Sequence, residues 1–246
     1  MATLPIDTVP AEASHPSERV DACALSFVAG FVDTCVFVGL FGLFTAHVTG
    51  NLALIGAALV HRTSDIVGKL VALPVFVLAV AAAVFATDSL RRAGRGRIAP
   101  LLYAESALLL LCVATIAVGG VPARPEQPAA IVAGVFAAAA MGFQNALMRL
   151  ELASLPSTTV MTVNVTQVSI DATILASRLA AGDARAAETR KRLQRMWPAI
   201  VVFVLGAACG ARSYAWLGLA SLVLPAAICI ALALRFARRP IAEAAG

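Results

Sequence analysis

The sequence has few charged residues and few aromatic ones. Only 13% of its 246 residues are Asp, Glu, Lys or Arg and 6% are aromatic, whereas 60% are hydrophobic. A soluble domain carries about 25% charged residues. This composition, with a mean hydropathy of +0.88, therefore excludes an ordinary soluble protein and predicts a membrane protein, with the lipid bilayer as its first partner.

The motifs of soluble enzymes are missing as well. There is no Walker A loop, no GxGxxG after a strand, no HExxH and no recognisable Ser/His/Asp arrangement. The five cysteines all lie in apolar runs and form no CxxC pair. We therefore expect no enzyme, no cofactor, no metal and no nucleic-acid partner, and we interpret the cysteines as small packing residues.

Long apolar runs are what the sequence has in abundance. They lie near residues 21–43, 66–87, 100–119, 129–148, 197–211 and 214–234. Each is close to the 20 residues that a helix needs to cross a bilayer core of about 30 Å. No long stretch alternates with period two, as a transmembrane β-barrel would. The predicted fold class is all-α, a polytopic bundle of about six transmembrane helices.

The two halves of the sequence resemble each other. GFVD at 30–33 matches GFQN at 142–145, the TGN triplet at 49–51 matches TVN at 162–164, and VFVLAVAAA from Val75 matches VFVLGAACG from Val202. Matches in the same order indicate a duplication. We predict a flexible tail at 1–19, one repeat at 20–119, a linker at 120–128, a second repeat at 129–238 and a C-terminal tail at 239–246.

Two polar elements decide the topology. They are predicted at 44–60 and 158–177, around the TGN and TVN triplets, and are short or polar for a crossing. If neither crosses, each half has three spanning helices and the second half is inverted. A cytoplasmic N-terminus then leaves only Arg62, Lys69, Arg124 and Arg212 outside, in line with the positive-inside rule. We favour two re-entrant or broken helices, with an eight-helix model as the rival.

This charge distribution also predicts the orientation of the chain, and we expect both termini in the cytoplasm. The polar N-terminal residues lack the basic start of a secretory signal. We therefore expect the first apolar helix to be retained, and a homo-oligomer is possible.

Ionisable residues within apolar runs are the first candidates for function, because they are costly in a membrane. Asp33 is the strongest, since its repeat partner Asn145 keeps the shape and the acceptor oxygen but not the charge. Asp171 lies in the second polar element. Glu105 opens the third apolar run near Tyr103, where a structural salt bridge is at least as plausible as a functional role. Ion or proton coupling and interhelical hydrogen bonding both remain open for Asp33.

The two polar elements predict the remaining site residues. Thr and Asn are good N-caps. If Thr49 and Thr162 each begin a half-helix, the positive ends of the helix dipoles face a central cavity, where Asn51 and Asn164 offer amide hydrogen bonds. Other members of the predicted substrate site are Asp33, Asn145, Gln144 and Asp171. The prediction is a transporter or channel for a small polar or anionic solute or ion, and the alternative is a non-transporting scaffold in which these residues only pack helices. His47 is expected to be a satisfied, partly buried histidine.

A set of motifs identifies a family. GFVD at 30–33, TGN at 49–51 followed by LALIGAAL, the basic turn at 91–97, Glu105, and GFQNALMR at 142–149 before TVNVTQ resemble the YoaK-type bacterial membrane proteins, which share a domain of unknown function. The resemblance covers about residues 18–238 and implies a multi-pass protein of the bacterial cytoplasmic (inner) membrane without an assigned substrate. The chain departs from the pattern where TVN replaces the second TGN-like triplet.

Overall fold

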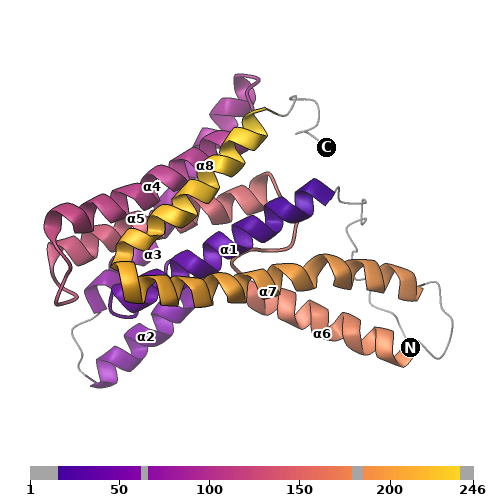
Figure 1. Cartoon of the computed structure of the whole chain (residues 1–246), viewed down its shortest axis with the longest axis horizontal. Coiled ribbons are helices and arrows are strands. Elements are labelled where there is room, and N and C mark those ends of the chain that lie inside the picture. Colours follow the sequence, from indigo (N-terminus) through magenta and orange to yellow (C-terminus); the bar gives the residue numbers. More distant parts are fainter. Residues whose placement is uncertain (1–15, 62–65, 179–184, 239–246) are drawn as a thin grey trace.

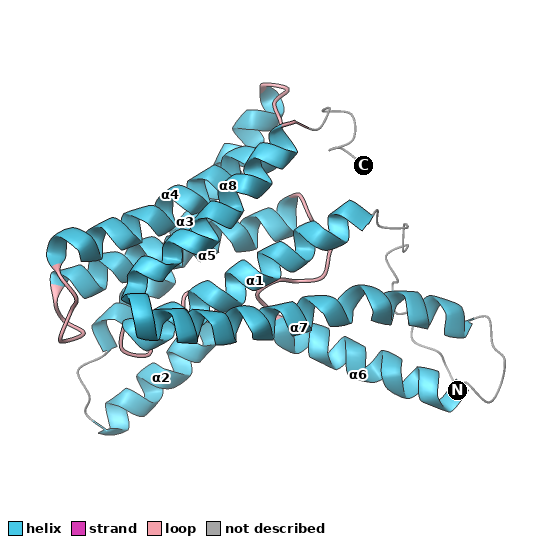
Figure 2. Cartoon of the chain, viewed as in Figure 1, coloured by secondary structure: helices cyan, strands magenta, loops and turns pink. Residues whose placement is uncertain are grey.

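Every regular element that the structure describes is a helix, which confirms the all-α prediction (Figure 2). The computed structural model describes residues 16–61, 66–178 and 185–238. Its elements are α1 (Pro16–Gly39), α2 (Val48–His61), α3 (Ile66–Arg92), α4 (Ile98–Gly119), α5 (Pro128–Leu150), α6 (Met161–Arg178), α7 (Arg185–Leu217), the 3₁₀ helix η1 (Gly218–Leu222) and α8 (Val223–Ala237).

Five stretches of the described chain are long and apolar enough to cross a membrane, and they contain six α-helices. Four are helices α1, α3, α4 and α5, and the fifth, Ala186–Ala237, has 52 residues and comprises α7, η1 and α8. The chain turns back at η1, where Gly218 has a φ of +58° (Figure 1). The break between the last two spanning helices lies later than the predicted one between residues 211 and 214. Arg212 is still part of α7, and its guanidinium lies 3.7 Å from the centre of the Trp216 ring.

Helices α2 and α6 are the two predicted polar elements, and neither crosses the molecule. Helix α2 has 14 residues, or about 21 Å at 1.5 Å per residue, which is less than a bilayer core of about 30 Å. It runs to the end of the molecule where α1 ends, whereas α6 runs to the end where α7 begins (Figure 1). Each short helix therefore returns to the side from which the chain came, which is the re-entrant arrangement and not the eight-helix one.

Long helices of each half of the chain pack against long helices of the other half. Helix α1 packs on α7 and α5 packs on α3, while α4 and α8 pack on each other. Gly30 of α1 lies against the carbonyl oxygen of Phe203, and Gly142 of α5 lies against that of Phe76. Gly30 and Gly142 are equivalent positions of the two repeats, and so are Phe203 and Phe76. The glycine of each repeat thus lies against the phenylalanine of the other repeat. Together with the opposite directions of α2 and α6, this exchange supports an inverted repeat.

Two apolar clusters form the interior. One joins α1, α4, α5, η1 and α8 around Phe31, Leu109 and Met141, and the other is built around Leu25, Leu102 and Leu147. Many large apolar side chains of α3, such as Phe85 at 73% exposed, point outward, as expected of a surface that faces lipid tails. The clusters hold the helices that carry the polar residues described below.

Several predicted boundaries are wrong. Helix α1 begins at Pro16, inside the predicted tail, whose first 15 residues lie outside the described chain together with the predicted tail at 239–246. The polar elements are α2 and α6, which begin at Val48 and Met161, four and three residues later than predicted. Residues 185–195, expected in a charged connection, form the first turns of α7, because Arg, Lys and Glu are good helix formers.

Candidate functional site: two loop-to-helix junctions

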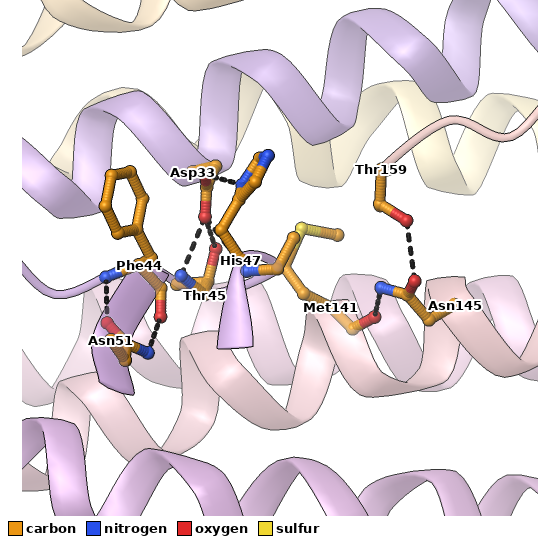
Figure 3. A network of polar contacts seen from close by, with 9 residues as sticks. Asp33, Phe44, Thr45, His47, Asn51, Met141, Asn145 and Thr159 are labelled. Carbon is orange, nitrogen blue, oxygen red and sulfur yellow. Dashed lines mark hydrogen bonds and ion pairs between the residues drawn. The ribbon is translucent and has the colours of Figure 1, made fainter. Parts of the chain in front are cut away.

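Asp33 lies on α1, and its carboxylate holds the loop that leads into α2 (Figure 3). Oδ1 accepts hydrogen bonds from the backbone N–H groups of Thr45 (2.7 Å) and Ala46 (2.9 Å) and from the Thr45 hydroxyl (2.9 Å). Oδ2 lies 2.5 Å from Nδ1 of His47. One buried carboxylate thus binds three consecutive loop residues and determines where α2 begins.

Asn51 closes the same junction from the α2 side. Its Oδ1 accepts the N–H of Phe44 at 2.9 Å, and its Nδ2 donates to the carbonyl oxygen of Phe44 at 2.7 Å. The amide therefore satisfies both polar groups of one residue, which matters because unpaired backbone groups at membrane depth are costly. Asn51 is buried, and both of these side-chain hydrogen bonds are made to the loop before α2.

The second junction repeats this arrangement with neutral groups. Asn145 of α5 accepts a hydrogen bond from the Thr159 hydroxyl at 2.6 Å and donates to the carbonyl oxygen of Met141 at 2.8 Å (Figure 3). Asn164 donates to the carbonyl oxygen of Ser157 at 2.6 Å, seven residues earlier, as Asn51 does to Phe44. Asn145 and Asn164 thus correspond to Asp33 and Asn51 in position, and both contact the loop before α6, although Asn145 binds a side-chain hydroxyl where Asp33 also binds backbone N–H groups.

Gln144 ties the second junction to α1. Its Nε2 donates to the carbonyl oxygen of Leu25 at 2.8 Å and to the Thr158 hydroxyl at 3.0 Å. Its Oε1 is buried without a hydrogen-bond partner among the described residues. This residue therefore links α5, α1 and the loop before α6.

Thr49 and Thr162 are not the N-caps that the sequence predicts. Helix α2 begins at Val48 and α6 at Met161, so each threonine is already the second residue of its helix. Both are exposed, whereas Asn51 and Asn164 two residues later are buried, because residues two apart on a helix point to different faces. The junctions are held by Asp33 and Asn145, which come from the preceding long helices.

Asp171 lies apart from both junctions. Its carboxylate accepts two hydrogen bonds from Arg192, Nε to Oδ2 at 2.7 Å and Nη2 to Oδ1 at 2.5 Å, and a third from Gln167 at 2.9 Å. This forked pairing of a guanidinium with a carboxylate is a strong and directional form of hydrogen bonding. Its position on the α6–α7 hairpin makes it a brace between these helices.

His47 connects the first junction to the other half of the protein. Its ring lies 6.3 Å from that of Phe203 on α7, and its side chain is 36% exposed. The hydrogen bond to Asp33 raises the pKa of His47 above its ordinary value, against the opposing effect of burial. The expectation of a satisfied, partly buried histidine agrees with this geometry, which leaves one side of the ring accessible.

Three further residues were missed or misplaced by sequence reasoning. Lys69, buried at 2% exposed, donates to the carbonyl oxygen of Phe41 at 3.0 Å; a lone lysine at the start of an apolar run was the available signal. For Glu105, a salt bridge near the interface was one of two interpretations beside a functional role, but the residue is fully buried, and neither carboxyl oxygen has a hydrogen-bond partner within the described chain. The salt bridge belongs instead to Glu151, which lies 3.0 Å from Arg97 and whose pKa burial raises.

The roomiest of the surface hollows described does not coincide with the junctions. One of about 590 Å³ lies at the α4–α5 turn, lined by residues that include Thr115, Gln127 and Val132, and none of its lining residues belongs to a junction. A much smaller one of about 10 Å³ lies beside Lys69. No group of three or more His, Cys, Asp or Glu side chains in the described ranges is arranged to hold a metal ion.

The fold and the two junctions define a class, that of polytopic helical membrane proteins with an inverted internal repeat and paired half-helices. Within it the chain belongs to the family described as protein of unknown function (DUF1275), whose model matches residues 22–235. The family resemblance expected from the sequence is confirmed. No curated protein and no solved structure matches the chain, so the family fixes no activity.

Proposed function

We propose that the protein is a transporter or channel for a small polar solute, and that the solute passes the two junctions near the middle of the membrane. The observation that carries this proposal is the pair of half-helices, α2 and α6, which begin near the centre and run to opposite ends of the molecule (Figure 1). Broken helices in inverted repeats place backbone polar groups at the midplane, where solutes and ions bind in many carriers.

The charge at the junctions bears on the class of solute. At the start of α2 the Asp33 carboxylate already occupies the N–H groups of Thr45 and Ala46, so an anion is disfavoured there. At the α6 junction the equivalent residue, Asn145, is neutral. We therefore propose a neutral polar solute, with anion contact confined to the α6 side.

The location proposed for this activity is the bacterial inner membrane, with both termini in the cytoplasm. The end of the molecule that holds the start of α7 and the α3–α4 turn carries basic groups that include Arg91, Arg92 and Arg190. Lys and Arg gather on the cytoplasmic side of membrane proteins. This orientation puts the end of α2 outside and the end of α6 inside.

One observation favours a second candidate, a non-transporting scaffold. The side chains of Asp33, Asn51 and Asn164 all form hydrogen bonds with nearby loops. Such bonds stabilise a helix bundle whether or not a solute passes through it. The scaffold predicts that neither junction admits water. The transporter predicts that both do.

Cysteine accessibility separates the two candidates. We would place Thr49→Cys or Thr162→Cys in a Cys209→Ala background, since Cys209 is the exposed native cysteine, and add a membrane-impermeant thiol reagent to each side of sealed vesicles. The transporter predicts labelling of both positions, and Ala58→Cys, which is buried on α2, is the unreactive control. Protection of both threonine positions from both sides would overturn the proposal. Gly50 is unsuitable, because an added Cβ would lie 2.9 Å from the Phe44 ring.

A further inference from the structure

Glu105 is a buried carboxyl group that makes no hydrogen bond to another helix among the described residues. It lies on α4, within a stretch long and apolar enough to span a membrane, and it is 0% exposed. Neither of its oxygens has a hydrogen-bond partner in the part of the chain that is described. An unpaired carboxylate in such a place is costly, so an ionisable group that holds no helix in place requires another explanation.

Glu105 lies at a boundary between the two apolar clusters. On α4 it is one turn beyond Leu102, which belongs to one cluster, and one turn before Leu109, which belongs to the other. Ser26 on α1 and Gln144 on α5 lie at the corresponding boundary of their own helices. Both carry a buried oxygen without a hydrogen-bond partner among the described residues, as Glu105 does. Unsatisfied oxygens on three helices therefore lie between the same two clusters.

The titratable groups around Glu105 are few, and none is a paired cation. Helix α8 contributes the Cys229 thiol, a weak donor that faces the carboxyl closely enough to interact with it, although neither carboxyl oxygen makes a hydrogen bond of ordinary geometry. Helix α5 has no ionisable side chain before Arg149, which is exposed, and η1 has none. Helix α3 touches α4 only marginally. Its charged groups lie toward its ends, at Lys69, Asp88, Arg91 and Arg92, and the cations of the last helix are Arg235 near its end and Arg238 just beyond it.

We propose that Glu105 is an exchangeable proton-binding site between the two apolar clusters. A proton is the ligand that suits a single carboxyl with no cation beside it. Binding forms one O–H bond and removes the negative charge from the apolar surroundings; release restores the carboxylate. The further statement that this proton couples to solute movement rests on the function proposed above, whereas the proton site itself does not.

Infrared spectroscopy of the full-length protein in lipid bilayers tests the site directly. A protonated carboxyl has a carbonyl stretch separate from the carboxylate bands and shifts when its proton is exchanged for deuterium. The difference spectrum between wild type and Glu105→Gln is expected to show one such band, which shifts in D2O and diminishes as the pH is raised over the range in which the protein stays folded. Glu151→Gln, which removes a carboxyl paired with Arg97, is the matched control and leaves the band unchanged.

Two outcomes would overturn the proposal. Absence of the band at every pH would mean that Glu105 stays ionised, and a band that neither shifts in D2O nor responds to pH would mean a locked proton with a purely structural role. Glutamine resembles the protonated acid in shape and charge, so Glu105→Gln is expected to fold, and its circular dichroism spectrum checks this. If the band behaves as expected while both junction cysteines stay protected, the proton site holds and the transporter proposal fails.

Discussion

The close approach of α1 and α7 makes one substitution especially informative. Gly206 lies on α7 against the carbonyl oxygen of Phe27, and a Cβ added there would come closer than 3.0 Å to that oxygen. Ordinary C···O contacts lie at about 3.3–3.6 Å. Gly206→Ala therefore forces the two helices apart by at least a few tenths of an ångström, and the contacting atom is backbone, which cannot rotate away.

The magnitude follows from a comparison with an unobstructed glycine. Gly68 of α3 has nothing within 4 Å of an added Cβ, so Gly68→Ala gains only helix propensity, about 1 kcal/mol. Gly206→Ala gains the same propensity but loses about 1–3 kcal/mol to overpacking. The difference between the two variants isolates the packing cost, and we expect Gly206→Ala to be the less stable by about 1–3 kcal/mol.

Unfolding in mixtures of SDS and mild detergent measures this difference. Both tryptophans, Trp197 and Trp216, lie on α7, so intrinsic fluorescence reports on the helix that is displaced, and circular dichroism follows the whole fold. The midpoint for Gly206→Ala is expected at or below that of wild type, and that for Gly68→Ala above it. If Gly206→Ala raised the midpoint as much as Gly68→Ala does, the packing of α1 on α7 described here would be refuted.

Three other predictions concern the polar residues. Asn51→Ala removes both hydrogen bonds to the loop before α2 and is expected to cost about 1–3 kcal/mol of unfolding free energy in the same assay. Asp171→Asn weakens the forked pair with Arg192, and we expect faster limited proteolysis of the α6–α7 hairpin. The raised pKa of His47 means that its bond to Asp33 stabilises the fold below the unfolded pKa of about 6.5 and is lost as the pH rises through the folded value; His47→Gln is expected to remove this part of the pH dependence.

Each of these predictions has its own control. Thr49→Ala, at an exposed position on the same helix as Asn51, is expected to leave the midpoint unchanged, and an equal loss would mean that α2 tolerates no substitution. Unchanged proteolysis of Asp171→Asn would show that the ion pair does not brace the hairpin. A pH profile that His47→Gln leaves unaltered would exclude the Asp33 bond as its source.

The sequence was sufficient for the features that depend on local pattern. Apolar runs predict the spanning helices because each such helix must be long and apolar by itself. The repeat is visible in the sequence because both copies keep GF near the middle of one helix and VFVL in another. The short polar elements were correctly expected to be re-entrant, since their length and polarity are unsuitable for a crossing.

The contacts of the site residues could not be predicted without the tertiary structure. Thr49 is a good capping residue in isolation, but the loop folds back onto α1 and Asp33 takes over the backbone groups that a cap would bind. Glu105 suggested a salt bridge because Tyr103 and the basic 91–97 turn are near in sequence. Whether a carboxyl meets a cation depends on which helices pack around it, and α5 and η1 bring none.

The exchanged packing of the halves has a consequence for how the protein is made. The principal partner of α1 is α7, which the ribosome produces only after most of the chain has been inserted, whereas α5 packs on α3 and α4, which precede it. The first helix therefore waits in the bilayer with its close-packing surface around Gly30 uncovered until synthesis is nearly complete. During this interval a membrane chaperone or lipid must cover that surface. Neither half can complete its own packing alone, but the two halves produced as separate chains have every surface needed to assemble with each other.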